Sequence, residues 1–212
     1  MKKKYLLLLC YLLTFNYVIA FAEDRVSIFI SPGLSFGRVH TDPDNVGFES
    51  NSVGFGGKLG ALYDWNIKNN YYLSSGLIFV LQQIVFKNPK LKEQHEMQYL
   101  QVPVLVKLYT GELDLDLRCY ATIGLIGALK INDWVSNTNH PKVFINKLRM
   151  CTINGLLGVG VEYQFSLSTS IFAGISYQLG LSSLFSEQNK QPSVPKLYGY
   201  GDLITLDIGI IV

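Results

Sequence analysis

The residues best suited to chemistry are three histidines spread along the chain, His40, His95 and His140. We expect each to lie in a separate long connection, and three imidazoles meeting at one end of the fold would suffice to bind zinc. Loop histidines are more commonly only solvated. His40-Thr41-Asp42 sets a base near a carboxylate, but no nucleophile with a specific signature accompanies it. We therefore predict no catalytic residues, no metal and no other cofactor; a hydrolase at the rim of the fold is the remaining enzymatic alternative.

Composition limits the class of protein. The 212 residues are 49% hydrophobic and only 16% charged, which excludes a disordered chain. A bundle of membrane-spanning helices is also excluded, because the only apolar run of nearly spanning length lies at the N-terminus. The length fits one domain, with or without a targeting segment.

The N-terminus has the pattern of an export signal. Lys2, Lys3 and Lys4 precede an apolar run over 5–19, and Ala20-Phe21-Ala22 provides the small-x-small cleavage pattern. We predict a signal peptide over 1–22 and a mature domain over 23–212; the run is short for a membrane anchor. Loss of the three lysines changes the formal net charge from +2 to −1. No basic cluster remains, so we expect no nucleic-acid partner.

The mature chain alternates between apolar and small or polar residues with a period of two, as strands do. Long polar connections, predicted over 38–51, 87–96, 131–147 and 182–201, alternate with short turns. This arrangement predicts an all-β fold, an eight-stranded antiparallel up-and-down transmembrane β-barrel. The strands are expected over 25–37, 52–65, 71–82, 99–109, 116–130, 150–164, 169–181 and 202–212.

A soluble, carrier-like barrel is the alternative fold, with the apolar phase of each strand inside. Its outer face would have to be well solvated, yet the second phase is rich in Gly and Ser. The strand over 52–65 would rise about 35 Å at a tilt near 40°, enough to cross an apolar band of about 25 Å. Aromatic residues on the apolar phase also lie beside the short turns, where an interfacial girdle would sit: Tyr63, Trp65, Tyr71, Tyr163 and Phe165.

The second phase carries charges of both signs that would point into the barrel. An eight-stranded barrel has an interior just wide enough to be filled by side chains. We expect several of these charges to pair there, because an unpaired buried charge costs on the order of several kcal/mol; an ion or proton path is the alternative. The expected network comprises Lys58, Lys107, Arg118, Glu162 and Asp207, with Asp64, Asp116 and Lys130 on the same phase.

Two cysteines remain after the predicted cleavage, Cys119 and Cys151. They fall on neighbouring predicted strands, but the expected register of that hairpin does not set them opposite each other. We therefore interpret both as small lipid-facing residues rather than as a disulfide.

Several motifs resemble the PorT-like outer-membrane β-barrel family of Bacteroidetes-type bacteria. The strand Tyr99-Leu-Gln-Val-Pro-Val-Leu-Val-Lys107 is similar to that family's Y-L-x-[IV]-P-L-L-x-K pattern. Further similarity covers Tyr120-Ala-Thr-Ile-Gly124, Gly158-Val-Gly160-Val-Glu162-Tyr163 and Tyr177-Gln-Leu-Gly180-Leu181. Ser176 stands where the family often has Arg, and Val212 where outer-membrane strands usually end in an aromatic residue. The resemblance implies a small barrel and an accessory role in protein secretion.

Together these patterns predict a monomeric, non-enzymatic barrel in the bacterial outer membrane. We expect it to contact outer-membrane lipid and to bind a protein partner through the four long connections. A narrow channel or carrier for small or hydrophobic solutes is the alternative function.

Overall fold

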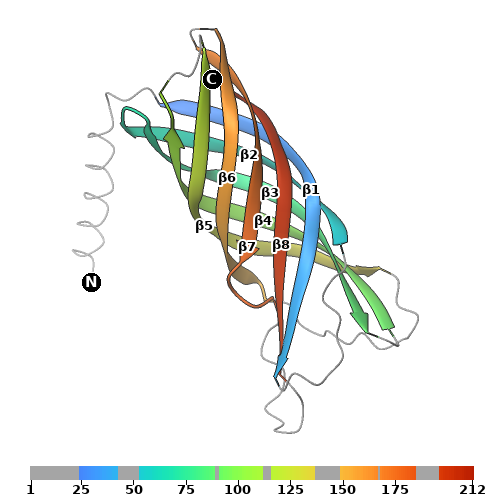
Figure 1. The fold of residues 1–212 in the computed structure, drawn as a ribbon. Coiled ribbons are helices and arrows are strands. Elements are labelled where there is room, and N and C mark those ends of the chain that lie inside the picture. Colours follow the sequence, from blue (N-terminus) through green and yellow to red (C-terminus); the bar gives the residue numbers. More distant parts are fainter. Residues whose placement is uncertain are drawn as a thin grey trace, which may run out of the picture.

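The structure, a computed structural model, describes residues 24–42, 53–88, 91–111, 116–136, 149–166, 168–184 and 196–212. The predicted signal peptide over 1–22 lies outside these residues. Each strand pairs antiparallel with its neighbours in sequence, and β1 also pairs with β8, so the sheet closes into a barrel (Figure 1). The strands are β1 (Arg25–Asp42), β2 (Val53–Lys68), β3 (Tyr71–Asn88), β4 (Leu91–Tyr109), β5 (Leu117–Ser136), β6 (Cys151–Ser166), β7 (Thr169–Gly180) and β8 (Lys196–Ile211).

The two ends of the barrel differ, and we name them for their connections. The turn end holds the connections β2–β3, β4–β5 and β6–β7 together with Asp24 and Val212. Val26 and Val212 exchange two backbone hydrogen bonds there, of 2.8 and 2.9 Å, which join the first strand to the last residue. The opposite end is the loop end. Among the described residues, no helix is long and apolar enough to cross a membrane.

The apolar phase of the strands faces outward. Phe55 is 78% exposed, Val159 63% and Leu157 56%, whereas Val80 and Ile126 on the other phase are fully buried. The alternative prediction, a soluble barrel with its apolar phase inside, is therefore wrong. An outward belt of Ile, Leu, Val and Phe side chains is instead suited to contact with lipid hydrocarbon.

The belt ends before the strands do. On β4 the outward side chains of Val102, Val104 and Val106 are exposed, but beyond Leu100 the outward residues toward the loop end are Gln98 and Glu96. Several strands continue past this level. On β4 this extension carries the polar Gln98 and Glu96 on its outward face and so need not contact hydrocarbon.

The prediction of a long connection over 87–96 is wrong. β3 runs to Asn88 and β4 begins at Leu91, and Asn88 pairs with Leu91. The predicted connections over 38–51, 131–147 and 182–201 are also shorter than expected, since β1, β5 and β8 extend into them, while their middles lie outside the described residues. Strand pairing needs only backbone groups. It therefore continues beyond the belt, where on β4 the alternation reverses and the polar residues Glu96 and Gln98 face outward.

Two glycines in the wall lie against an aromatic side chain inside the barrel. Tyr120 lies opposite Gly160 in the β5–β6 ladder, and Gly160 lies opposite Gly174 in the β6–β7 ladder. A Cβ atom added to Gly160 would lie 2.5 Å from the hydroxyl oxygen of Tyr120, and one added to Gly174 would lie 2.7 Å from it. The two glycines thus leave the space that the tyrosine side chain occupies.

Because the belt faces hydrocarbon, the loss of stability caused by an outward charged side chain should depend on its depth in the membrane. We expect Val104→Arg, at the middle of the belt, to lower the free energy of unfolding by about 2–4 kcal/mol, and Gln98→Arg, beyond its edge, by about 0–1 kcal/mol. Urea unfolding of the protein folded into phospholipid vesicles measures both. Equal losses in the two variants would contradict the assignment of the belt to hydrocarbon.

Candidate functional site

Ion pairs cross the barrel interior near the turn end. Arg25 on β1 contacts Glu162 on β6 at 3.1 Å. Lys107 on β4 contacts Asp64 on β2 at 2.7 Å, and the same Asp64 oxygen accepts a 2.8 Å hydrogen bond from Ser27. Asp64, Lys107 and Glu162 are all buried. Because the paired strands are not neighbours in the sheet, these contacts link parts of the wall that backbone pairing does not join directly.

A third ion pair lies further inside. The ammonium of Lys58 is 3.3 Å from Asp207 and donates a 2.8 Å hydrogen bond to Ser176. Thr205 donates to Asp207 at 2.8 Å and is also hydrogen-bonded to Ser176 at 2.8 Å. Lys58 is only 4% exposed, so its charge depends for stabilisation on the Asp207 carboxylate and the Ser176 hydroxyl.

Four members of the predicted network, Lys58, Lys107, Glu162 and Asp207, thus lie in these pairs. The fifth, Arg118, is partly buried and lies opposite Glu162 in the β5–β6 ladder. Two other charges that were predicted to point inward are not part of these ion pairs. Asp116 is exposed in the β4–β5 turn, with a φ of 68°. Lys130 pairs with half-exposed Asp133 at 2.7 Å. The sequence reasoning missed Arg25, although the inward phase of β1 could have indicated it.

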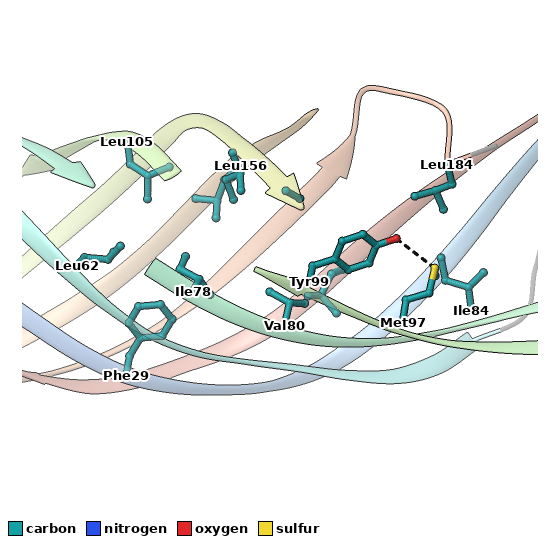
Figure 2. Close-up of a cluster of buried hydrophobic side chains, with 13 residues drawn as sticks. Phe29, Leu62, Ile78, Val80, Ile84, Met97, Tyr99, Leu105, Leu156 and Leu184 are labelled. Carbon is teal, nitrogen blue, oxygen red and sulfur yellow. Dashed lines mark hydrogen bonds between the residues drawn. The ribbon is translucent and has the colours of Figure 1, made fainter. Parts of the chain in front are cut away.

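The interior also holds an apolar cluster (Figure 2), together with further buried polar side chains such as His95 and Gln101. Val80, Ile84 and Ile126 are fully buried, and Leu184, from the segment after β7, packs into the same cluster. Its backbone N–H donates to Gly199 at 2.7 Å, and its carbonyl accepts from Arg149 at 2.7 Å. The cluster comprises Phe29, Leu62, Ile78, Val80, Ile84, Met97, Tyr99, Leu105, Ile126, Ala128, Leu156, Leu184 and Leu203.

Sequence analysis expected charges and small residues to occupy the interior and missed this cluster. The signal was present: Leu62, Ile78 and Val80 break the small-polar phase of their strands. They were not recognised because apolar residues on both phases also fit lipid-facing patterns.

A cavity of about 60 Å³ lies inside the barrel, where the ion pairs meet the apolar cluster. Its lining includes Lys58, Lys107, Asp207 and the ring of Phe172. This volume holds only a few water molecules, far below the 300–1,000 Å³ of typical small-molecule pockets. Passage of a solute would require the apolar cluster to move.

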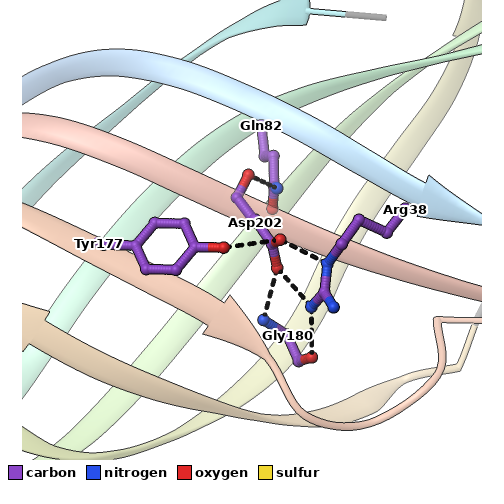
Figure 3. Close-up of polar contacts among 5 residues, drawn as sticks. All are labelled: Arg38, Gln82, Tyr177, Gly180 and Asp202. Atoms are coloured by element: carbon purple, nitrogen blue, oxygen red, sulfur yellow. Dashed lines mark hydrogen bonds and ion pairs between the residues drawn. The ribbon is translucent and has the colours of Figure 1, made fainter. Parts of the chain in front are cut away.

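A second polar site lies at the loop-end edge of the belt (Figure 3). Arg38 binds Asp202 through two hydrogen bonds, of 2.6 and 2.9 Å. Tyr177 donates to Asp202 at 2.9 Å and the backbone N–H of Gly180 at 3.0 Å. The β7–β8 ladder ends at Gln178, so the carboxylate satisfies a backbone donor just beyond it.

The position of this site explains its composition. Asp202 lies on the phase of β8 that carries Ile204 and Leu206 outward, so its charge would border hydrocarbon if it stood alone. A two-point contact with Arg38 neutralises it. Sequence analysis missed the site, although an aspartate on an apolar phase is a signal that a partner is needed.

The five aromatic residues predicted for a girdle all lie on the outward phase near the turn end. Phe165 is 76% exposed, Tyr71 53%, Tyr163 44% and Tyr63 37%. Trp65 is partly buried, and its ring centroid lies 5.0 Å from that of Tyr63. This placement suits the boundary between hydrocarbon and headgroups.

Two of the three histidines lie on strands rather than in the loops expected for them. His95 is not in a connection but on β4, where it is 1% exposed inside the barrel. The backbone of His40 lies in β1, and His140 lies outside the described residues. Among the described residues no group of three or more His, Cys, Asp or Glu is arranged to hold a metal ion.

Cys119 and Cys151 are free thiols on the outward phase. Cys119 lies opposite Val161, and Cys151 lies opposite Leu129, so the register separates them along the hairpin.

The buried Lys107–Asp64 pair gives a stability test. Lys107→Met should lower the free energy of unfolding by about 3–5 kcal/mol, because it leaves the Asp64 carboxylate buried without its cation. Adding Asp64→Asn should recover most of this loss, since the amide is neutral and keeps an acceptor for Ser27. Urea unfolding measures all three proteins; a double variant no more stable than Lys107→Met would refute the pairing argument.

Comparison with known proteins places this barrel in a family. A family model described as an outer membrane protein beta-barrel domain matches residues 21–186. No curated protein sequence matches the chain. Its fold is similar to that of the outer membrane protein OprG from Pseudomonas aeruginosa, with a TM-score of 0.57 and 11% identity over 90% of this chain and 95% of that chain.

Two further small barrels are more distant in structure. The N-terminal β-barrel domain of Pseudomonas aeruginosa OprF has a TM-score of 0.43 and 12% identity over 89% of this chain and 97% of that chain. Neisserial surface protein A has a TM-score of 0.42 and 13% identity over 87% and 96%. Because the family model spans most of the chain, the protein belongs to the family of outer membrane proteins with this β-barrel domain and resides in the bacterial outer membrane.

Proposed function

We propose that this protein is a non-enzymatic scaffold of the outer membrane that binds a partner beyond the loop end of the barrel. The observation that carries this proposal is the filled interior. Among the described residues, ion pairs and apolar side chains fill much of the interior, and the cavity between them measures only about 60 Å³. A barrel closed in this way is better suited to holding a surface in the membrane than to passing solutes.

Strand extensions supply part of that surface. Beyond the belt, β3, β4 and β5 remain paired, with the side chain of Gln83 donating to Glu96 at 3.3 Å on the outward face. Trp134 on the same extension is 48% exposed. Exposed tryptophan beside polar groups is enriched at protein interfaces. An accessory role in protein secretion rests on the PorT-like resemblance alone.

The competing function is a narrow channel or carrier. The observation in its favour is that charged residues line the interior from Arg25 to the cavity, which leaves the apolar cluster as the main barrier.

Conductance separates the two functions. We expect purified protein in planar lipid bilayers to give no stable current steps, because the apolar cluster excludes ions. A variant carrying Ile126→Gly and Leu203→Gly should conduct, and its migration on unheated gels checks that it has folded. Steady current steps from the unaltered protein would overturn the scaffold proposal in favour of a channel.

Partner binding is tested directly by photo-crosslinking in cells. A photoreactive phenylalanine analogue at position 134 should give an adduct of discrete mass, and the same analogue at position 69, in the β2–β3 turn, should not. The captured protein is identified by mass spectrometry, and the adduct is then reproduced with both proteins purified. Absence of an adduct at position 134, or an adduct at position 69 only, would contradict a partner at the loop end.

A further inference from the structure

The lipid-facing wall has a groove near the turn end. It has a volume of about 620 Å³, is largely open on its outer side and crosses four strands, β4 to β7. Backbone atoms form its floor, at four cross-strand neighbours on the inward phase: Tyr109, Tyr120, Gly160 and Gly174. The two tyrosine side chains point inward, and the glycines have no side chain.

Two rows of outward side chains border this floor, and small residues in both rows leave space above it. One row consists of Leu108, Ala121, Val159 and Ile175, and the other of Thr110, Cys119, Val161 and Ala173. The next row toward the loop end has no residue smaller than valine: Val106, Ile123, Leu157 and Tyr177. The depression is therefore local to the rows that contain Ala121, Cys119 and Ala173.

We propose that this groove binds one acyl chain of a membrane lipid. Four neighbouring strands span about 14 Å at a spacing near 4.8 Å, a length suited to part of an extended hydrocarbon chain. The groove is continuous with the belt that faces lipid, and apart from Thr110 its bordering side chains are apolar or a thiol.

A second copy of the chain is the weaker occupant. The groove is lined by twelve residues, whereas a stable protein interface uses about 20–30 residues on each side. An unbranched chain also fills a narrow trough between two side-chain rows without needing a complementary protein surface. This inference is independent of the proposed scaffold function, because it concerns the wall rather than the loop end.

Native mass spectrometry of the protein in detergent, with added phosphatidylethanolamine, tests the proposal. The unaltered protein should carry one bound lipid. Ala121→Leu combined with Ala173→Leu fills the groove and should abolish this adduct. Ala61→Leu, at an exposed outward alanine on β2, is the matched control and should keep it.

Each possible result either supports or overturns the acyl-chain site. Loss of the adduct in the groove variant alone supports the acyl-chain site. Equal lipid binding in all three proteins, or equal loss in both variants, overturns it. A dimer that is present in the unaltered protein and disappears in the groove variant would assign the groove to a second copy instead. Migration on unheated gels confirms that every variant has folded.

Discussion

The structure depends on one constraint: within hydrocarbon, every backbone N–H and C=O must find its partner inside the protein. The pairing of β1 with β8 meets this requirement by removing both edges of the sheet. Closure with eight strands also sets the girth, and an interior of this width has room for side chains but not for a wide pore. The outward belt and the filled interior both follow from that closure.

Inside the closed wall, charge and apolar packing divide the space. The Lys107–Asp64 pair lies toward the turn end, and the Lys58–Asp207 pair lines a cavity together with apolar cluster residues, while Ile84, Met97 and Leu184 extend the cluster toward the other end. Buried charges persist where each has a counter-charge and hydrogen bonds. The same requirement operates at the edge of the belt, where Asp202 lies on a lipid-facing phase and is neutralised by Arg38. At that point the ion pair also bonds a backbone group just beyond the end of the β7–β8 ladder.

Local sequence patterns predicted the strand number, the antiparallel order and the lipid-facing phase, because alternation within one strand reports which side meets hydrocarbon. They failed at the strand ends, where His95 lies on β4 rather than in a loop. There the polar residues Glu96 and Gln98 face outward and Met97 faces inward, so the alternation has the opposite polarity to that of the lipid-facing belt. They also missed the apolar cluster, since Ile78 and Val80 gain their meaning only when residues from other strands meet them across the lumen. Arg38 and Asp202, 164 residues apart in sequence, were missed for the same reason.

The sequence by itself determined the barrel, the outward direction of its hydrophobic phase and the inward direction of charges such as Lys58, Lys107 and Asp207, because each is encoded by a period within a single strand. Only the tertiary structure decided which charges pair, where Leu184 packs and where small residues such as Ala121 and Ala173 line up into a groove. These features depend on the register between strands and on closure of the sheet. Register and closure bring together residues that no local pattern relates to one another.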